Sequence, residues 1–369
     1  MTRPLVWILR SAHAGDNTQL LALVRALGYP YEIKSLSYRK GEWLPRMLLG
    51  ATLAGVDLSQ SSSLGPPPPD LVLCAGRATE AAARWIRANL NARARLVYIG
   101  PPWSNPRHFD LVISSPQYRT TAHPHVLNTA MPLHDLDAAK LAESAKRWCT
   151  RLGHLPRPLT AVLAGGASGP YRFGAAAGAR LGRLASARVR HVGGALLVST
   201  SARTPAVTAD ALTASLSVPA DIFRWQPGVS ENPLMGYFAL ADDFIVTADS
   251  ISMIAEACST GKPVFLFDTE EGPRAMRAEE HRAARGGALP APHWRGADAS
   301  ATLWRLAMAY GAKSWTRDIR IVHRKVVTCG LAAWTGDPAP SRREPTPSPD
   351  LAQAVRRIHA FFEPSTTKP

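Results

Sequence analysis

The stretch DDFIVTADSISMIAEACSTGKPVFLF, residues 242–267, constrains the fold more than any other part of the chain. Phe244 to Thr247 form a short apolar run of the kind that makes a buried strand. In the helix that follows, apolar residues recur at helical spacing from Ile251 to Cys258, and Gly261 is the expected stop. Pro263 to Phe267 predict a second buried strand. A strand–helix–strand unit of this kind implies two parallel strands joined by a right-handed crossover.

The start of that helix is a candidate anion site. Asp249 or Ser250 is the expected N-cap, and Ser250 and Ser252 lie beside backbone N–H groups at the positive end of the helix dipole. Glu256 lies further along the same helix, roughly 9 Å from Ser250 along the axis. A phosphate at the helix start and a sugar hydroxyl at the Glu256 carboxylate would suit a nucleotide. An ordinary capped helix with a solvent-facing glutamate would give the same pattern.

The rest of the chain alternates strands and helices in the same way. Such alternation predicts an α/β fold with two Rossmann-like, doubly wound parallel sheets, whose ligands lie beyond the carboxyl ends of the strands. Two such domains facing each other would form a central cleft. The expected strands are residues 5–9, 31–35, 70–76, 95–100 and 110–115 in the first half, and 160–166, 195–201 and 220–225 in the second. Helices are expected from residue 17 or 18 to 27, and over 43–53, 77–90, 138–152, 175–187, 204–216, 232–241, 301–310 and much of 270–290.

Proline-rich and polar segments suggest the domain boundaries. The segment GHLPRP, from Gly153 to Pro158, follows a long helix and predicts a junction. GDPAPSRREPTPSP predicts a flexible linker over residues 336–350, before a short amphipathic helix. The expected domains are therefore 1–153 and 154–335, followed by that linker and by a C-terminal helix and tail at 351–369.

The composition of the chain favours some classes of binding partner and excludes others. The formal net charge of +15 favours phosphates, acidic glycans or an anionic membrane surface, although general solubility charge would explain it equally well. No RNP-like or helix-turn-helix pattern accompanies the charge, so we expect no nucleic-acid partner. The four cysteines are far apart and form no zinc motif, which favours a reducing compartment and no metal. No apolar run is long enough for a transmembrane helix, so we expect a cytoplasmic protein.

A second candidate phosphate loop, Gly165-Gly166-Ala167-Ser168-Gly169, follows the first strand of the second half. Glycines let backbone N–H groups approach a phosphate, and the next helix adds its dipole. A plain strand-to-helix turn would explain the loop as well. Because it and residues 249–256 both follow strands of one predicted sheet, both are expected to reach one nucleotide.

The first half offers candidates for acid–base chemistry. His13 and Asp16 lie in the loop after the first strand, where a carboxylate or imidazole would serve as a general base. Alternatively, Asp16 caps the following helix. His123 and His125 are lesser candidates that a surface loop would also explain. Glu279, Glu280 and His281 would reach a donor sugar or form a solvated helix face.

These motifs together resemble a known group of proteins. The GGASG loop, the serine-rich helix start, Glu256 and Gly261-Lys262-Pro263 resemble the donor-binding half of GT-B glycosyltransferases. VTADSISMIAEACSTGKPV, with the upstream segments NPLMGYFALAD and STSARTP, is more closely similar to the elongated-mitochondria (mitochondrial fission) family, over nearly all of residues 4–330. The chain departs from that family at Ala14-Gly15-Asp16, where a Gly-His pair is usual, and at Pro116-Gln117-Tyr118.

The resemblance implies a metal-independent glycosyltransferase that needs no cofactor. Its first domain would be the acceptor side and its second domain would bind the nucleotide sugar. It implies that Arg203 neutralises the leaving diphosphate and that Glu256 holds the ribose. The donor residues that it implies are Gly165, Gly166, Ser168, Arg203, Asp249, Ser250, Ser252 and Glu256.

The resemblance also implies the partners. The acceptor would be a cell-surface glycan or its lipid-linked precursor, reached at the inner face of the cytoplasmic membrane. Two alternatives stay open: a non-catalytic adaptor that keeps the GT-B shell, as in the plant members linked to fission, and a sugar-nucleotide epimerase.

Overall fold

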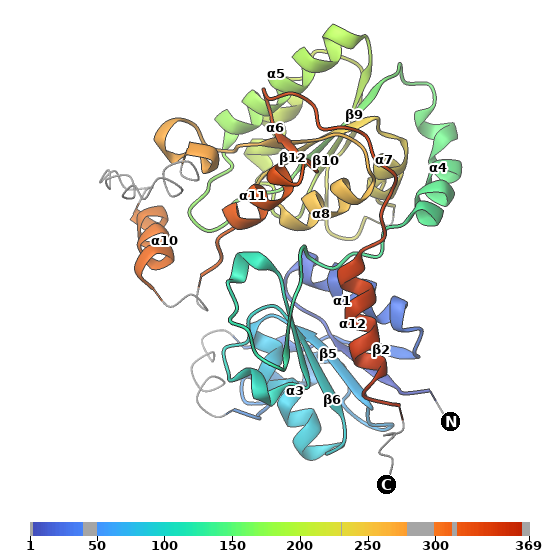
Figure 1. Ribbon diagram of the computed structural model, residues 1–369, viewed down its shortest axis with the longest axis vertical. Helices are drawn as coiled ribbons and strands as arrows, with labels where there is room; N and C mark the ends of the chain where they lie inside the picture. Colours follow the sequence, from blue (N-terminus) through green and yellow to red (C-terminus); the bar gives the residue numbers. More distant parts are fainter. Residues whose placement is uncertain (1–2, 40–49, 230, 279–298, 312–315, 364–369) are drawn as a thin grey trace. The chain divides into compact units, whose positions relative to one another are not determined.

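The computed structural model describes residues 3–39, 50–229, 231–278, 299–311 and 316–363 (Figure 1). The chain divides into two compact units. Unit 1 comprises Met1–Asp135 together with Ser348–Pro369, and unit 2 comprises Leu136–Pro347. A domain boundary was expected near residue 153, but the units divide between Asp135 and Leu136, so residue 153 follows a helix of unit 2. The C-terminal helix belongs to unit 1.

Unit 1 is built on a sheet of six parallel strands in the order β2-β1-β5-β6-β7-β8. The chain places β2 on one side of β1 and then returns to the other side with β5, so Val6 of β1 pairs with Tyr31 and with Leu71. The strands are β1 (Val6–Leu9), β2 (Tyr31–Lys34), β5 (Leu71–Ala75), β6 (Arg95–Ile99), β7 (Leu111–Ser114) and β8 (Val126–Asn128). A small antiparallel pair, β3 (Ser37–Tyr38) and β4 (Val56–Asp57), accompanies it.

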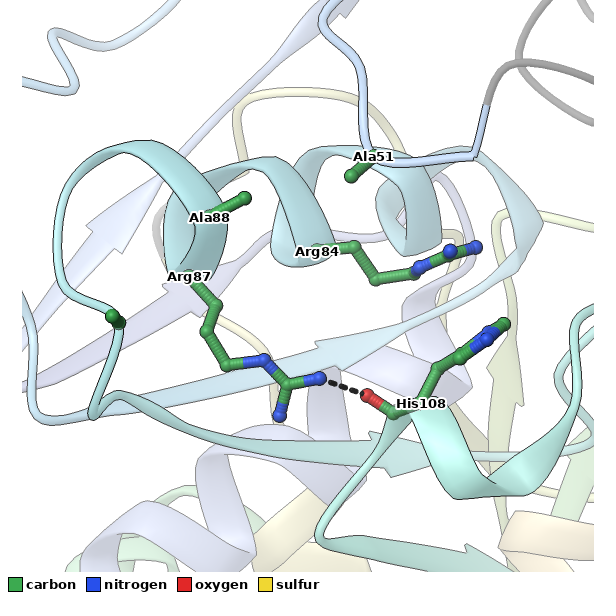
Figure 2. Close-up of a pocket in the computed structure, with 6 residues that line it drawn as sticks. Ala51, Arg84, Arg87, Ala88 and His108 are labelled. Atoms are coloured by element: carbon green, nitrogen blue, oxygen red, sulfur yellow. Dashed lines mark hydrogen bonds between the residues drawn. The ribbon is translucent and has the colours of Figure 1, made fainter.

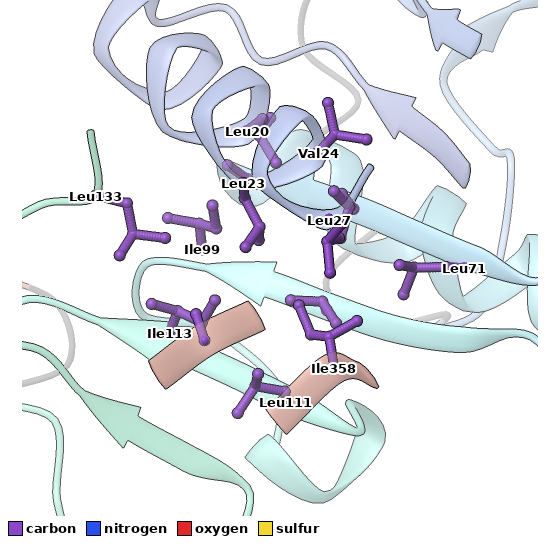
Figure 3. Close-up of a cluster of buried hydrophobic side chains, with 14 of the residues drawn as sticks. Leu20, Leu23, Val24, Leu27, Leu71, Ile99, Leu111, Ile113, Leu133 and Ile358 are labelled. Carbon is purple, nitrogen blue, oxygen red and sulfur yellow. The ribbon is translucent and has the colours of Figure 1, made fainter. Parts of the chain in front are cut away.

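Helices cover the sheet of unit 1 because apolar side chains alternate between its two faces. On one face, leucines of α1 (Ala14–Leu27) and Ile358 of α12 (Pro349–His359) pack with residues of β5, β6 and β7 (Figure 3). On the other face, Ile86 of α3 (Arg77–Asn89) packs with Trp7 and Val72. The Asp350 carboxylate of α12 also accepts the N–H groups of Ala130 and Met131. The C-terminal helix is therefore part of the core of unit 1. The described residues of this unit also form three single-turn 3₁₀ helices: η1 (Leu58–Gln60), η2 (Pro106–His108) and η3 (Pro116–Tyr118).

Unit 2 is built on a second all-parallel sheet, in the order β11-β10-β9-β12-β13-β14. Its strands are β9 (Leu159–Ala164), β10 (Ala195–Thr200), β11 (Ala220–Phe223), β12 (Asp243–Thr247), β13 (Val264–Phe267) and β14 (Ala333–Trp334). Its helices are α4 (Ala138–Leu152), α5 (Ala175–Val192), α6 (Ala206–Ala214), α7 (Leu234–Leu240), α8 (Ile251–Ser259), α10 (Ala299–Tyr310) and α11 (Arg320–Thr328), with one turn of 3₁₀ helix, η4 (Gly272–Arg274).

The two doubly wound parallel sheets confirm the predicted fold class. The central β12–α8–β13 unit lies where its sequence pattern placed it. None of the helices in the described ranges is both long enough and apolar enough to cross a bilayer. The helix expected over 43–53 and the one expected over 270–290 lie largely outside the described residues.

Two segments differ from expectation. Helix α1 begins at Ala14 rather than at residue 17 or 18, because the Asn17 amide bonds both the N–H and the C=O of Ser11 instead of capping its own helix. The segment before α12, expected as a flexible linker, is part of unit 2 and is hydrogen-bonded within it: the N–H of Arg343 donates to Gly261 O at 2.7 Å, and that of Thr346 donates to Ser259 O.

Candidate functional site

The strand order of unit 2 locates its ligand edge. From β9 the chain adds β10 and β11 on one side and then returns to add β12 on the other, so the order reverses between β9 and β12. At such a point the loops that follow the two strands diverge, and ligands of open α/β sheets bind there. The loops that follow β9 and β12 are the two candidate phosphate segments of the sequence.

Gly165 and Gly166 allow these two loops to approach closely. The N–H of Gly165 donates to the Thr247 hydroxyl at 2.8 Å, and that of Gly166 donates to the Asp249 carboxylate at 2.9 Å. A Cβ atom at Gly165 would lie 2.5 Å from an Asp249 oxygen, and one at Gly166 would lie 2.2 Å from the Arg203 carbonyl oxygen. Both N–H groups are therefore engaged within the protein. This corrects the expectation that they approach a phosphate directly: here the glycines position neighbouring loops.

Asp249 points into the protein rather than toward a ligand. Its side chain is fully buried, and burial raises its pKa, although the Arg203 guanidinium and the Gly166 N–H oppose that rise. One oxygen forms an ion pair with Arg203 at 2.9 Å, and the other accepts no hydrogen bond from the part of the chain that the structure describes. Asp249 therefore holds Arg203 against the loop, so its part in the expected donor site is a positioning one.

Arg203 links the three loops at this edge. Besides Asp249, its guanidinium donates to the Ala167 carbonyl and to the Ser250 hydroxyl, each at 3.3 Å. Its side chain is 43% exposed, so it reaches solvent although its carboxylate partner does not. The structure thus brings Arg203 to the start of α8, as the implied role of this residue requires.

Arg317 is a second guanidinium at the site, and no sequence motif indicated it. It donates to the Ser168 hydroxyl at 2.6 Å and to the Asp249 carbonyl at 3.4 Å. It makes no ion pair with any carboxylate in the described ranges, so its charge is balanced less than that of Arg203. No local motif marks it, because it comes from the loop before α11, far along the chain from both partners.

The start of α8 supplies backbone donors. Ser250 is the N-cap, as one of the two expected caps, but its side chain accepts no capping hydrogen bond. The first-turn N–H groups, those of Ile251, Ser252 and Met253, have no acceptor within the described part of the chain, as is usual at a helix start. With two arginines nearby, this end of the sheet can bind an anion with more than one charge.

The remaining donor candidates lie around this helix. Ser252 and Glu256 are both half-buried on α8, with Glu256 in its second turn. Ser168 is nearly buried and pairs with Tyr171 through two backbone hydrogen bonds. The structure therefore gathers Ser168, Arg203, Ser250 and Ser252 around one helix start.

His323 supports the loop before α8. Its Nε2 lies 2.6 Å from the Ala248 carbonyl oxygen, and its ring contacts Trp334 edge-on. Burial lowers the pKa of His323 to about 4, so the ring is neutral at pH 7 and Nε2–H is the donor. This contact fixes the turn that carries Asp249 and Ser250.

Unit 1 has its own reversal of strand order, between β1 and β5. The loop after β1 carries His13, which is exposed and is the N-cap of α1, and Asp16, which is half-buried in the first turn. Asp16 accepts the Ser11 hydroxyl at 2.8 Å, and that hydroxyl also accepts the His13 N–H. The two candidates for the base thus lie at the ligand edge of their sheet.

The lesser candidates are placed differently. His125 lies before β8 and is held by the Phe109 carbonyl at 2.6 Å, while His123 accepts the His125 N–H. Glu279, Glu280 and His281 lie outside the described residues. Among the described residues, no group of three histidine, cysteine or acidic side chains could hold a metal ion.

Comparison with known proteins places these features in context. A family model described as "Mitochondrial fission ELM1" matches residues 14–307. The chain is 32% identical over 224 residues to the Mitochondrial fission protein ELM1 of Arabidopsis thaliana, a match that covers 55% of this chain and 52% of the plant protein. It therefore spans about half the length of that relative.

A bacterial relative and a solved structure extend the comparison. The uncharacterized protein RP120 of Rickettsia prowazekii is 25% identical over 295 residues, covering 71% of this chain and 82% of that protein. The structure of S. aureus MnaA with UDP aligns over 100% of this chain and 99% of that one, with a TM-score of 0.50 and 11% identity. At that identity the likeness is one of fold, and it agrees with the GT-B-like arrangement of two parallel sheets.

Proposed function

The chain belongs to the Mitochondrial fission ELM1 family, and from this premise we propose that it is a nucleotide-sugar-dependent glycosyltransferase whose donor binds to unit 2. One observation carries the proposal: Arg203 and Arg317 lie beside the N-terminus of α8 at the point where the strand order of the sheet reverses. A diphosphate needs such a combination of backbone donors and guanidinium groups.

In this proposal the diphosphate lies over the first turn of α8. Its oxygens accept the free N–H groups of that turn and the hydroxyls of Ser250 and Ser252. Arg203 and Arg317 neutralise the charge that develops on the leaving diphosphate, a task that suits planar guanidinium groups. Gly165, Gly166 and Asp249 hold the loops in place, and no metal is needed.

The ribose lies toward Glu256, whose carboxylate accepts its hydroxyls from the second turn of the helix. Unit 1 supplies the acceptor side, with Asp16 or His13 as the base that takes a proton from the acceptor hydroxyl. We propose a cell-surface glycan or its lipid-linked precursor as acceptor. The basic balance of the chain suits a phosphorylated acceptor or peripheral contact with the inner face of the cytoplasmic membrane.

The first experiment is calorimetric binding of UDP, GDP, CDP, ADP and CMP to the wild type and to Glu256→Ala. Micromolar binding of one nucleotide, weakened by the substitution, supports the donor site and narrows the choice of sugar. Glu271→Ala is the matched control, because Glu271 is an exposed carboxylate of the same unit outside the site.

Binding of none of these nucleotides would overturn the proposal. A non-catalytic adaptor built on the same fold would then be the better account. Conversion of a bound nucleotide sugar to its isomer without transfer would favour an epimerase.

A further inference from the structure

A shallow pocket in unit 1 lies away from both loops that the proposed function uses. Its volume is about 350 Å³, and it lies beside α3 and η2 (Figure 2). The residues that line it are Ala51, Arg84, Arg87, Ala88, Ala92 and His108. Three alanines leave the space open, and every ionisable group of the lining is basic. An open space with this lining favours an anion.

The two arginines of the pocket differ in what neutralises them. Arg87 forms an ion pair with Asp110 at 3.1 Å and donates to the His108 carbonyl at 2.6 Å. Arg84 makes no hydrogen bond and no ion pair with the described residues, and its guanidinium lies close to the backbone of Gly50. Arg84 is thus a cation beside an open space, and no carboxylate of the described residues pairs with it.

His108 completes the cationic side of the pocket. Figure 2 shows its ring and the Arg84 guanidinium reaching the same side of the space. Its Nδ1 is buried and has no hydrogen-bond partner among the described residues. Burial lowers the pKa of His108, and Arg84 and Arg87 lower it further, while Glu80 opposes them. These groups disfavour the protonated form of His108, and an anion beside the ring would favour it.

Two carboxylates near the pocket, Glu80 and Asp110, are engaged with other groups. Glu80 is buried and accepts the N–H groups of Trp103 and Ser104 at 2.9 and 3.0 Å. Asp110 is bound by Arg87 and Arg95. Neither carboxylate is therefore available as a counter-ion for Arg84. The pocket thus offers an anion the positive charge of Arg84 and the His108 ring, which can take up a proton.

We propose that this pocket binds a phosphate group, carried either by a small molecule or by a phospholipid headgroup. A phosphate dianion matches the pocket because one oxygen pairs with Arg84 while the charge stabilises a proton on His108. A carboxylate, with a single charge, would gain less from the histidine. The proposal is independent of the donor site in unit 2.

The test follows the His108 ring by NMR during titration with inorganic phosphate, with the signal assigned through His108→Gln. Phosphate should raise the pKa of His108 by about one unit, the size expected for a new opposite charge at close range. Arg84→Gln and Ala88→Glu should each abolish that change. Ala88→Glu keeps a good helix former while it places a carboxylate four residues from Arg84, so it controls for misfolding. Arg183→Gln removes an exposed charge from α5 and should behave as the wild type.

A second arm identifies the source of the phosphate. If the ligand is a headgroup, the wild type should sediment with vesicles of phosphatidylcholine and phosphatidic acid, and both pocket variants should be released. If the ligand is a small molecule, the variants should lose the response to phosphate and keep the vesicle binding of the wild type. A His108 signal that ignores both phosphate and vesicles overturns the proposal, as does a response that survives in Arg84→Gln and Ala88→Glu.

Discussion

The two units present opposite charges at the edge of the sheet where the strand order reverses. In each, a carboxylate follows a strand that flanks the reversal of strand order: Asp16 after β1 and Asp249 after β12. Asp16 is half-buried and accepts a serine hydroxyl, whereas Asp249 is fully buried and paired with Arg203. At this edge of the sheet, the exposed charge of unit 2 is therefore cationic. The corresponding edge of unit 1 presents a carboxylate and an imidazole. Topology determines where a ligand edge lies, and the burial of one carboxylate determines which charge that edge presents.

The largest expected effect concerns unit 1. If Asp16 is the base of the proposed transfer, Asp16→Asn should lower turnover by about 10²- to 10⁴-fold, the usual contribution of a positioned base, and leave nucleotide affinity unchanged. The measurement is release of nucleoside diphosphate from the nucleotide sugar selected by calorimetry, with extracted membrane lipids and glycans as acceptors.

Glu32→Gln serves as its control, because Glu32 is a partly exposed carboxylate on β2 that pairs with Lys34 away from the loop. His13→Gln tests the other candidate in the same assay. Full turnover in both Asp16→Asn and His13→Gln would remove the contrast between an acid–base unit 1 and an anion-binding unit 2.

The next effect is a dependence of stability on pH that arises from His323 of unit 2. The pKa of His323 is about 4 in the native state and about 6.5 when unfolded, so the unfolded chain binds an extra proton between these values. Stability should thus fall as pH drops from about 6.5 toward 4, by up to about 3 kcal/mol. His323→Gln keeps a donor for Ala248 and removes the titration, so its stability should depend less on pH in this window.

Urea unfolding of the wild type and His323→Gln at pH 7.5 and pH 5 measures this difference. His134 of unit 1 also has a pKa lowered by burial, so the wild-type slope should contain a part that His323→Gln leaves in place. Equal slopes in the wild type and the variant would show that His323 is not held neutral beneath the turn.

A smaller effect distinguishes the two arginines of unit 2. Arg317→Gln should weaken binding of the selected nucleoside diphosphate by about 10- to 100-fold, the value of one or two hydrogen bonds to a charged group, with little loss of stability. Arg203→Gln should weaken binding similarly and also destabilise the fold, because it leaves the buried Asp249 without its cation.

Calorimetry and thermal unfolding on the same samples test this pair, with Arg183→Gln as the control for net charge. If Arg317→Gln binds nucleotide as tightly as the wild type, the second guanidinium has no part in the donor site.

Local pattern was enough to predict β12, α8 and β13, because each is defined by neighbouring residues of the sequence: an apolar run, a helical period and a glycine stop. It also predicted the two parallel sheets from alternation alone. It misplaced the start of α1, because the Asn17 side chain bonds Ser11 rather than its own helix end. Propensity near a helix start does not show which of several polar side chains will act as the cap.

Long-range packing accounts for what the sequence did not show. Arg317 reaches Ser168 from 149 positions along the chain, and nothing in its local context marks it. The burial of Asp249 follows from two glycines that bring another loop against it, so it could not be inferred from its place before a helix. The placement of α12 on unit 1 likewise depends on residues far from it in sequence.

The smallest effect concerns the boundary between the units, through one helix cap in each. Ser348 caps α12 by accepting the Leu351 N–H, and Asp137 caps α4 by accepting the Lys140 N–H. Replacing either residue by alanine should lower the free energy of unfolding by about 1 kcal/mol. Since α12 packs with α1 and α4 belongs to unit 2, Ser348→Ala should lower amide-exchange protection in α1 and α12, by about fivefold, and leave α8 unchanged. Asp137→Ala should lower protection in α4 and leave α1 unchanged. An equal loss of amide-exchange protection in both units from either variant would mean that the two sheets unfold together. The two units would then differ in the chemistry of their ligand edges and not in stability.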